Sequence, residues 1–359
     1  MKNIKKMHMK ALPGKLFLAP MAEISTPALR QIIKEFHPPA VLYSEMLSAG
    51  AVVAGAPHNE PLLRAYDFDE PLIYQIVGAH PSIMADACSI LADRGCNGVD
   101  INMGCPNHEI VKKGQGARLL ADIGKAREII RACRKVLTVS LSVKLRTGYE
   151  NNDEKQFVTF IRMLEDEGVD FIAVHPRYAK LSFRRLADWR FITLAKQSVS
   201  IPVIGNGDIV SPDTAIEKML ETGCDGIMIG REAVKSPWIF HLIDCLIKGC
   251  PSALTVNFRD IFITTLSNMR DYLPERLHMS RSHRFSIYFS KNACFGHELF
   301  KKIRMESSIE LIQEIVDDYY RRNPEEVIKE FRVGNGSTHD DGTPLPVHHL
   351  NDGCVSTVR

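Results

Sequence analysis

Residues 141–175 read LSVKLRTGYENNDEKQFVTFIRMLEDEGVDFIAVH, and this stretch contains one complete unit of a repeating pattern. The apolar run Leu141–Arg146 predicts a buried strand, the apolar positions of Glu154–Glu167 recur at helical spacing, and Phe171–His175 predicts a second strand. Nearly continuous apolar strands separated by amphipathic helices are typical of a parallel sheet that is covered by helices. The unit therefore predicts an α/β fold.

The same alternation of strand and helix runs through most of the chain. Eight strands are expected, at Leu16–Ala19, Val41–Ser44, Leu72–Ile76, Gly98–Asn102, Leu141–Arg146, Phe171–His175, Val203–Asn206 and Gly226–Ile229. Amphipathic helices are expected between them, for example at Pro81–Arg94, Lys125–Val136, Glu154–Glu167 and Pro212–Glu221. Eight such units close naturally into a (β/α)8 TIM barrel, which we predict, with an open doubly wound sheet as the alternative.

The pattern changes after Lys248, where the strand signal stops and only helical periodicity remains. We therefore divide the 359 residues into a barrel over 1–250, a smaller all-helical domain over 251–332 and a tail over 333–359. The tail mixes Gly, Asp, His and Pro without periodicity, so we expect it to be disordered.

Composition and charge exclude several classes of protein. With 45% hydrophobic and 25% charged residues, the chain is typical of a globular protein. The formal net charge is only +2, so a nucleic-acid footprint must be a local patch. The nine cysteines form no Cys-x-x-Cys pair, and neither disulfides nor metal ligation is expected. No apolar run has the length of a signal peptide or membrane span, so we expect a cytoplasmic protein without a membrane partner. We also expect a monomer.

Glycine-rich turns after the last two strands predict a phosphate site. Barrels carry their chemistry on the loops at the carboxyl ends of the strands, and glycines there let backbone N–H groups approach an anion. The two turns are Asn206-Gly207-Asp208 and Gly230-Arg231. Either cluster alone could equally consist of ordinary turn residues. Together, with Arg231 as a positive charge, they favour phosphate.

Three further residues at strand ends could contact a heterocyclic ligand. Lys144 emerges from an apolar strand, where an ammonium is costly unless it faces a polar site. It could contact the N1/O2 edge of a flavin, or it could form a Schiff base. A lone histidine at a strand end is more often structural, but beside Arg177 we expect His175 to contact a ligand. Gln75 could bind a heterocycle edge or could be a polar group satisfied within the protein.

Cys105 is the candidate catalytic residue. It stands between Gly104 and Pro106 after the fourth predicted strand, and the Gly- and Lys-rich loop Val111–Ala117 follows it. Most free cysteines are inert residues of the core, but this thiol is expected at the barrel mouth, where the loop could close over a substrate. A thiol is mostly protonated at neutral pH, so it could act as a general acid or as a nucleophile.

These motifs resemble, in their order along the chain, those of the tRNA-dihydrouridine synthases. LAPMA at 18–22 is similar to the family's N-terminal flavin motif. DINMGCP at 100–106, followed by GQGARLL at 114–120, is similar to its active-site signature. Three more segments stand in family order, namely VKLRTG at 143–148, IPVIGNGDI at 201–209 and GIMIGR at 226–231. Such an ordered set of motifs seldom arises by chance.

The resemblance implies an enzyme that reduces the C5–C6 double bond of specific uridines in tRNA to 5,6-dihydrouridine. FMN is the implied cofactor, NADPH or NADH the reductant, and Cys105 the acid that protonates C5. The residues implied to hold FMN are Pro20, Met21, Ala22, Gln75, Lys144, His175, Asn206, Gly207, Asp208, Gly230 and Arg231. The residues expected to contact RNA are Asn102, Arg146, Arg177, Arg281, Arg284, Lys291 and Arg304.

The helical domain carries the basic segment that we expect to hold tRNA. From Arg276 to Arg304 there are seven Lys or Arg residues and one acid, Glu298, with Phe and Tyr residues between them. We expect the aromatic side chains to lie in the core and the charges to contact RNA. The alternative is a set of ordinary amphipathic helices whose charges are only solvated.

The chain differs from the family pattern near the expected RNA path. Glu109 stands where the family usually has Lys, Pro176 where it has Gly, and three later positions also differ, namely Leu181, Phe183 and Arg185. Three other functions stay open: an FMN barrel that reduces a small pyrimidine or enone, a tRNA-binding paralogue without turnover, and a non-redox phosphosugar enzyme. The first has no use for the basic helices, and the intact active-site signature argues against the second.

Overall fold

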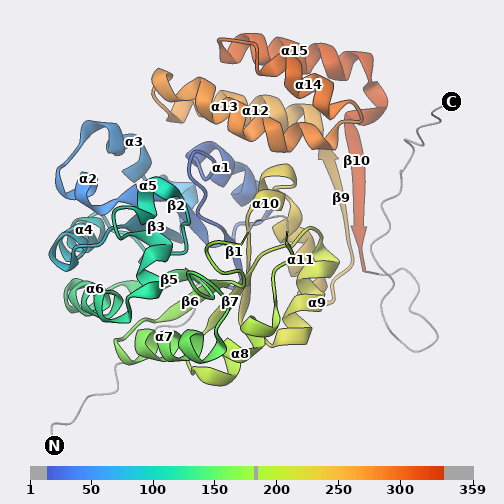
Figure 1. Ribbon diagram of the computed structural model, residues 1–359. Helices are drawn as coiled ribbons and strands as arrows, with labels where there is room; N and C mark the ends of the chain where they lie inside the picture. The colour runs from blue at the N-terminus through green and yellow to red at the C-terminus, as the bar shows by residue number, and fades with distance from the viewer. Residues whose placement is uncertain (1–13, 182–184, 335–359) are drawn as a thin grey trace, which may run out of the picture.

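The computed structural model describes residues 14–181 and 185–334, and within it eight parallel strands form one sheet (Figure 1). The strands are β1 (Leu16–Leu18), β2 (Leu42–Ser48), β3 (Leu72–Val77), β4 (Gly98–Met103), β5 (Ser140–Arg146), β6 (Phe171–His175), β7 (Val203–Asn206) and β8 (Gly226–Ile229). They are hydrogen-bonded in the order β1-β8-β7-β6-β5-β4-β3-β2, and a parallel bridge between Phe17 and Val41 closes the sheet. The predicted TIM barrel is confirmed, and the alternative of an open doubly wound sheet is wrong.

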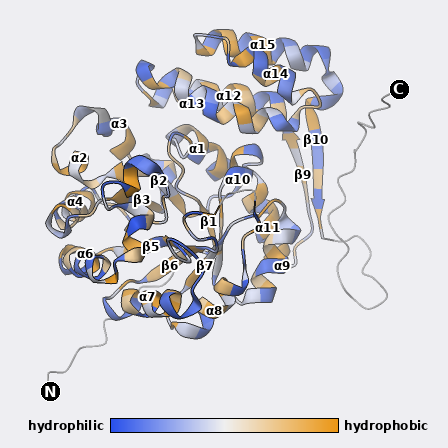
Figure 2. Ribbon diagram, viewed as in Figure 1, coloured by the Kyte–Doolittle hydropathy of each residue, from blue (hydrophilic) through white to orange (hydrophobic). Residues whose placement is uncertain are grey.

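Helices cover the outside of the barrel, and the longer ones each turn one apolar face toward the strands, whereas the short α5 has no buried residue. In α7, Phe157, Phe160 and Leu164 share one face and are buried, and the side chain of Asp153 caps the helix by accepting the N–H of Gln156. The outer helices are α1 (Pro27–Phe36), α2 (Ala49–Val53), α3 (Glu60–Leu63), α4 (Pro81–Asp93), α5 (His108–Val111), α6 (Ile123–Val136), α7 (Glu154–Asp166), α8 (Arg190–Ser198), α9 (Pro212–Thr222), α10 (Arg231–Lys235) and α11 (Ile239–Lys248). Figure 2 shows hydrophobic residues recurring along the strands and alternating with hydrophilic ones on the helices.

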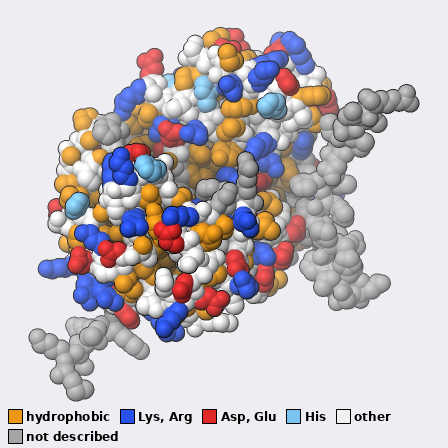
Figure 3. All heavy atoms as spheres, in the orientation of Figure 1, with side chains coloured by type: hydrophobic (Ala, Val, Ile, Leu, Met, Phe, Trp, Pro, Cys, Tyr) orange, Lys and Arg blue, Asp and Glu red, His pale blue; other side chains and the backbone are white. Residues whose placement is uncertain are grey.

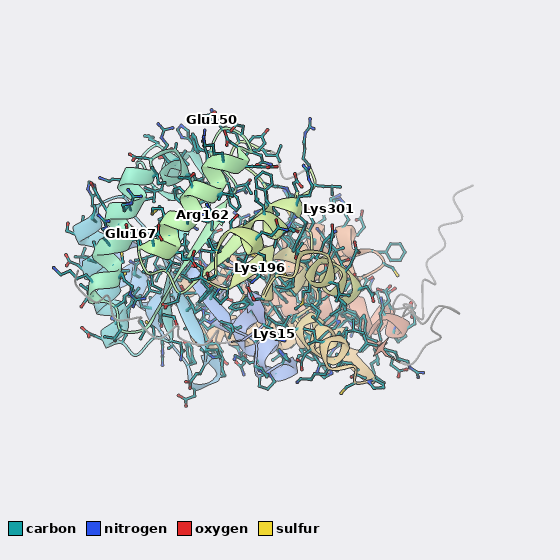
Figure 4. All side chains as sticks on the ribbon, turned by 90° about the horizontal axis from the view of Figure 1, so that it is seen from below. Lys15, Glu150, Arg162, Glu167, Lys196 and Lys301 are labelled. Carbon is teal, nitrogen blue, oxygen red and sulfur yellow. The ribbon has the colours of Figure 1, made fainter. Side chains whose placement is uncertain are left out.

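The interior of the barrel is filled by side chains. Phe17, Tyr43, Phe171 and Met228 belong to a separate buried cluster inside the ring of strands, and the rings of Phe17 and Phe171 lie 5.9 Å apart. The interior of the barrel is therefore a packed core and not a pore. Figure 4 shows the two ends: Glu150, which follows β5, and Lys15, which precedes β1, lie far apart along the barrel axis.

The described residues 258–334 form four α-helices that pack together above the barrel (Figure 1). They are α12 (Phe258–Tyr272), α13 (Glu275–Phe289), α14 (Gly296–Ile303) and α15 (Ile309–Arg322). Two strands not predicted from the sequence, β9 (Ser252–Asn257) and β10 (Ile328–Val333), pair antiparallel, with Ser252 opposite Val333. The tail that we expected to be disordered, 333–359, starts at Val333, which is the last residue of β10, so the expectation is wrong at that residue. Residues 335–359, like Phe183, lie outside the described residues.

The helices and the barrel share one hydrophobic core. The ring of Trp238, which follows α10, meets Phe258 at 5.3 Å, Phe331 at 5.2 Å and Phe289 at 6.5 Å. Of the aromatic residues expected in the core, Phe289 is fully buried, whereas Phe295 is 60% exposed, so that expectation is wrong for Phe295. Because these contacts cross between the two parts of the chain, the helices hold a fixed position relative to the barrel mouth.

Candidate functional site

A hollow of about 890 Å³ opens at the carboxyl ends of the strands, between the barrel and α13. Figure 3 shows the surface hollowed between the barrel and the upper helices. Among the lining residues are all of those predicted to hold a cofactor, namely Pro20, Met21, Ala22, Gln75, Lys144, His175, Asn206, Gly207, Asp208, Gly230 and Arg231. Cys105 lines the same hollow. The residues selected from strand ends along some 210 positions of sequence thus lie around one space, as parallel strand ends require.

Cys105 is half-buried at the rim and is held by its backbone. Its N–H donates to the side-chain oxygen of Asn102 at 2.8 Å, and the same oxygen accepts the N–H of Gly104 at 3.0 Å. The carbonyl of Cys105 accepts the N–H of Ala117 at 3.0 Å. The sequence predicted that Asn102 contacts RNA, but its side chain is nearly buried and its oxygen is committed to the loop. Asn102 is therefore better described as the residue that positions the thiol.

A buried hydrogen-bond chain continues below Asn102. Its side-chain nitrogen donates to Gln75 Oε1 at 2.8 Å, and Gln75 Nε2 donates to Asp100 Oδ2 at 2.7 Å. The hydroxyl of Ser142 donates to the other oxygen of Asp100 at 2.7 Å. Burial raises the pKa of Asp100 to about 6, and the bonds from Gln75 and Ser142 oppose that rise. Asp100 was not among the predicted site residues, although an acid inside an apolar strand is the same signal that marked Lys144.

Lys144 lines the hollow, and its ammonium loses its proton more easily than that of an exposed lysine. Its ammonium donates to Asn206 Oδ1 at 3.0 Å, and the amide nitrogen of Asn206 donates to the carbonyl of Met228 at 2.8 Å. Burial, followed by the positive charge of Arg146, lowers the pKa of Lys144 to about 8. An ammonium in this state gains from any anionic group that enters the hollow.

His175 is held neutral by the same environment. Burial lowers its pKa to about 2, and positive neighbours lower it further, namely Lys144, Arg146, Arg177 and Arg231. Its Nε2 lies 2.7 Å from Nη1 of Arg177, so the imidazole accepts there and carries its proton on Nδ1. This concentration of cations makes the hollow a site for an anionic ligand.

Arg177 was predicted to contact RNA, but the structure buries it almost completely. Its Nη2 donates to both carboxylate oxygens of Asp208 at 2.8 and 2.7 Å, and its Nε donates to the carbonyl of Arg185 at 2.7 Å. Asp208 has a left-handed φ of +54° and also accepts the N–H of Ala187 at 2.8 Å. Arg177 thus lines the hollow and fixes its wall between β6 and β7, with its Nε and Nη2 bonded to Arg185 and Asp208.

Arg146 has a similar place, although it too was predicted to contact RNA. It is 3% exposed, its Nε donates to the carbonyl of Gly104 at 3.0 Å, and its Nη1 donates to the carbonyl of Tyr178 at 3.2 Å. Burial lowers the pKa of Arg146 to about 10. Its guanidinium thus ties the loop that carries Cys105 to the loop after β6.

The loops after β7 and β8 lie next to one another because Asn206 pairs with Met228 in the sheet. Gly207 has a φ of +120°, and a Cβ there would lie 2.9 Å from His175 Cδ2. A glycine is required at this close approach. Arg231, at the start of α10, is exposed.

The basic residues of the helical part lie in three kinds of place: in the hollow, in ion pairs with the barrel, and on the surface outside the hollow. Lys291 lines the hollow, with its Nζ 5.3 Å from the ring centre of Tyr288. Arg304 is exposed at the end of α14, outside the hollow. Arg281 and Arg284 form ion pairs with barrel residues. On the face drawn in Figure 3, Lys and Arg side chains are interspersed with acidic ones, in line with the small net charge.

Two of the positions that depart from the family pattern have defined surroundings. Glu109 is exposed on α5 and lies 3.7 Å from Nζ of Lys112 and 3.2 Å from Nδ1 of His108. Pro176 is buried beside the Arg177 network, and its carbonyl accepts the N–H of Asp188 at 2.9 Å.

No group of three or more His, Cys, Asp or Glu among the described residues could hold a metal ion. The helices within 14–181 and 185–334 include none with the length and apolarity of a membrane span.

The barrel is closed and parallel, and its mouth brings together cations, a neutral histidine and a free thiol. These features are typical of a TIM-barrel enzyme that binds an anionic ligand. The family model described as "Dihydrouridine synthase (Dus)" matches residues 17–313. The chain belongs to the dihydrouridine synthase family, as its motifs predicted.

Relatives with known names agree with this assignment. The chain is 33% identical over 269 residues to tRNA-dihydrouridine synthase B of Pseudomonas aeruginosa, covering 74% of this chain and 80% of that protein. It is 34% identical over 232 residues to tRNA-dihydrouridine synthase B of Shewanella oneidensis, covering 65% and 71%. Among solved structures, a 2-naphthoyl-CoA reductase complex matches with a TM-score of 0.50 and 13% identity, over 66% of this chain and 50% of that one. That last likeness concerns the fold alone.

Replacing Gly116 by alanine is expected to displace the loop that holds Cys105. Gly116 has a φ of +59°, and a Cβ there would lie 2.8 Å from the carbonyl oxygen of Cys105 and 2.8 Å from Ile110 Cγ2. The left-handed backbone alone costs an L-residue about 1–2 kcal/mol. We expect a matching loss in the free energy of unfolding, measured by urea denaturation, and faster alkylation of Cys105, measured by mass spectrometry.

Gly124→Ala is the matched control, because a Cβ at Gly124 in α6 meets nothing closer than 3.6 Å. It is expected to leave both quantities unchanged or to stabilise the helix slightly. Equal behaviour of the two variants would show that Gly116 does not hold the loop.

Proposed function

We propose that this chain reduces the C5–C6 double bond of uridines in tRNA to 5,6-dihydrouridine, with FMN as cofactor and NADPH or NADH as reductant. One observation carries the proposal: the thiol of Cys105 lines the same hollow as the cationic group around Lys144. Cys105 lies close enough to Lys144 to influence the pKa of the lysine. An acid is thus placed beside a site for an anionic ligand. That pairing is what the reduction of a uracil ring by a flavin requires.

The residues of the hollow fit FMN. An isoalloxazine that becomes anionic on reduction would restore the full charge of Lys144, whose pKa burial lowers to about 8. A phosphate would fit the adjoining turns at Gly207 and Gly230, where backbone N–H groups and Arg231 are available. The segment Pro20–Ala22 would contact the ring from β1. When bound, the reduced flavin supplies the hydride that adds to C6 of uracil.

Cys105 would complete the reaction as a general acid. Its Sγ–H bond breaks, the proton forms a new C–H bond at C5, and the thiolate regains a proton from water. With the hydride, the net change is uridine plus NADPH and H⁺ to dihydrouridine and NADP⁺. Asn102 and Arg146 hold the loop of Cys105 through hydrogen bonds to its backbone, which limits how far the thiol can move. Lys144 keeps a positive charge beside the reacting groups.

The substrate base must leave its stack to reach this site. The hollow lies at the strand ends, below α13, whose Ile287 and Tyr288 form part of its rim. Extruding a nucleotide costs a few kcal/mol, so the protein must hold the surrounding RNA. We propose that residues 251–332 do so through exposed cations such as Lys291 and Arg304, while residues 1–250 carry out the chemistry. A monomeric state and a cytoplasmic location remain predictions.

The experiment that tests this function starts with the absorbance spectrum of the purified protein. A yellow protein that forms dihydrouridine in unmodified tRNA with NADPH, detected by mass spectrometry of nucleosides, would support the proposal. The same assay with uracil or a simple enone in place of tRNA separates it from a small-molecule reductase. A colourless protein that cannot be loaded with FMN would exclude any flavin reaction and favour a non-redox barrel enzyme.

The affinity for FMN is expected to fall as the pH rises above about 8. In the free protein Lys144 holds its proton only below that value. An anionic ligand favours the charged lysine, so binding is tightest below the pKa and weakens by up to about tenfold per pH unit above it. Fluorescence titration of FMN between about pH 6.5 and 9.5 measures the slope.

Lys144→Arg is the control for this dependence, because a guanidinium stays charged over the whole range. Its FMN affinity is expected to be lower overall but flat with pH. A slope that is the same in both proteins would mean that another group titrates.

A further inference from the structure

Arg281 of α13 is buried between the helical part and the barrel, where it meets two carboxylates. It is 8% exposed, and its Nη2 donates to Glu45 Oε2 at 3.2 Å. Its Nη1 lies 3.5 Å from Glu23 Oε1. Glu45 belongs to β2 and is 5% exposed, so the pair joins α13 to the mouth of the barrel in a nearly dry environment. A cation so placed is not available to RNA, although it was predicted to contact it.

Glu23 is constrained by its backbone and by its side chain. Its φ of +64° lies in the left-handed region, which is uncommon for a residue other than glycine. Its N–H donates to Glu45 Oε2 at 2.6 Å, and its carboxylate accepts from Nε of Arg284 at 2.9 Å. The unusual conformation is therefore maintained by Glu45, and Glu45 in turn is neutralised by Arg281.

The segment held in this way follows directly on the proposed flavin contact. Pro20, Met21 and Ala22 line the hollow. The N–H of Met21 donates to the hydroxyl of Ser25 at 2.7 Å, and that hydroxyl donates to the carbonyl of Ala19 at 3.0 Å. The turn from residue 19 to residue 25 is thus braced internally at Ser25. From outside it is held by Arg30, which donates to the Ser25 carbonyl at 3.0 Å, and by the path through Glu23 and Glu45 to Arg281.

Charge balance explains why the path through Glu23 and Glu45 needs Arg281. Glu23 and Glu45 lie close together, and burial raises the pKa of Glu45 while Arg281 lowers it. Without the guanidinium, the buried Glu45 carboxylate would face that of Glu23 with no charged donor from α13 of its own, whereas Glu23 is partly exposed and keeps Arg284. Glu45 would then take up a proton or turn away, and the N–H of Glu23 would lose a charged acceptor.

We propose that Arg281 is a positioning residue for the flavin: through Glu45 and Glu23 it holds the turn 19–25 against the barrel mouth. The helical part then contributes to cofactor affinity as well as to RNA binding. This inference rests on the proposed function, because the turn matters only if residues 20–22 contact FMN.

The test compares FMN affinity among variants of the full-length protein. Arg281→Met keeps the length of the side chain and removes its charge, and we expect the dissociation constant for FMN to rise about tenfold or more, the loss of one charged anchor. Arg281→Lys is expected to recover part of the affinity, since one ammonium replaces the two-armed guanidinium. Affinity for tRNA, measured by filter binding at saturating FMN, is expected to stay within about twofold.

Arg270→Met is the matched control, because Arg270 forms exposed ion pairs with Asp271 and Glu310 on the helical part. It should leave FMN affinity unchanged. An Arg281→Met protein that binds FMN like the control but loses tRNA affinity would overturn the inference and make Arg281 an RNA contact.

Glu45→Gln keeps the inference testable if Arg281→Met does not fold. The amide retains the shape and an oxygen acceptor but not the charge, so FMN affinity should fall while the fold is kept. An unchanged affinity in Glu45→Gln would overturn the inference. If the wild-type protein itself bound no FMN, the proposed function would fail instead, so the two failures are distinguishable.

Discussion

Replacing Cys105 by alanine is expected to slow dihydrouridine formation by about 10²- to 10⁴-fold, the usual contribution of a positioned general acid. The thiol is the proposed proton source, the loop after β4 places it at the hollow, and the backbone of Cys105 is fixed by Asn102 and Ala117. Removing one sulfur atom leaves these bonds in place, so FMN affinity should not change. The rate is measured in a single turnover, with the flavin reduced beforehand and dihydrouridine quantified after quenching.

Two controls separate loss of the acid from loss of the site. Reduction of the bound flavin by NADPH should proceed at the wild-type rate in Cys105→Ala, because no proton to C5 is involved in that step. Cys250→Ala removes an exposed thiol away from the hollow and should have full activity. If Cys105→Ala formed dihydrouridine at the wild-type rate, the proton would have to come from another donor, and the assigned role would be abandoned.

The barrel could be predicted from the sequence because its information is local and repeated. Each strand is a short apolar run followed by an amphipathic helix, and all eight predicted strands overlap those of the structure. The polar residues that end these strands could be assigned to one site for the same reason. Parallel strands place all their carboxyl ends at one edge, whatever the distance between them in sequence.

The ribbon of β9 and β10 could not be predicted in this way. Its strands are separated by four helices, and each is only half-buried, so neither stands out as an apolar run. Their pairing depends on a contact between the two ends of the helical part. Sequence periodicity records which face of a segment is buried, but not which distant segment it meets.

The directions in which the arginine side chains point could not be predicted from the sequence either. Arg146, Arg177 and Arg281 were predicted to contact RNA, since a basic residue near a site is most simply placed on its surface. All three are buried and bonded to carboxylates or backbone carbonyls. A guanidinium has five donors, and only the three-dimensional arrangement of acceptors decides whether they bind protein or ligand. The sequence therefore predicted which residues gather at the hollow, but not that these three guanidinium groups are bonded within the protein.

Replacing Arg30 by methionine is expected to lower the free energy of unfolding by about 3–5 kcal/mol, the usual cost of leaving one partner of a buried ion pair alone. The side chains of Arg30 and Asp69 are 2% and 1% exposed. Arg30 Nε donates to Asp69 Oδ1 at 2.7 Å, its Nη2 donates to Asp69 Oδ2 at 2.8 Å, and its Nη1 donates to the carbonyl of Ser25 at 3.0 Å. The substitution would leave a carboxylate and a carbonyl without these donors.

Urea denaturation measures this loss, with the fluorescence of the buried Trp189 and Trp238 as the signal. Because Arg30 also holds the carbonyl of Ser25, whose hydroxyl braces Met21, FMN affinity should fall together with stability. The exposed pair of Arg94 and Glu60 provides the control. Arg94→Met should cost no more than about 1 kcal/mol, since solvent already screens that pair.

The double variant Arg30→Met/Asp69→Leu decides whether the cost comes from the unpaired charge or from the shape of the site. Two apolar side chains leave no buried carboxylate, and replacing a buried ion pair by apolar residues is often neutral, so the double variant should be more stable than Arg30→Met alone. If its loss equalled the sum of the two single losses, the pair would not be coupled. Arg30 would then stabilise the protein mainly through its hydrogen bond to the carbonyl of Ser25. In either case FMN affinity should stay low in the double variant, because no guanidinium is present to hold the turn.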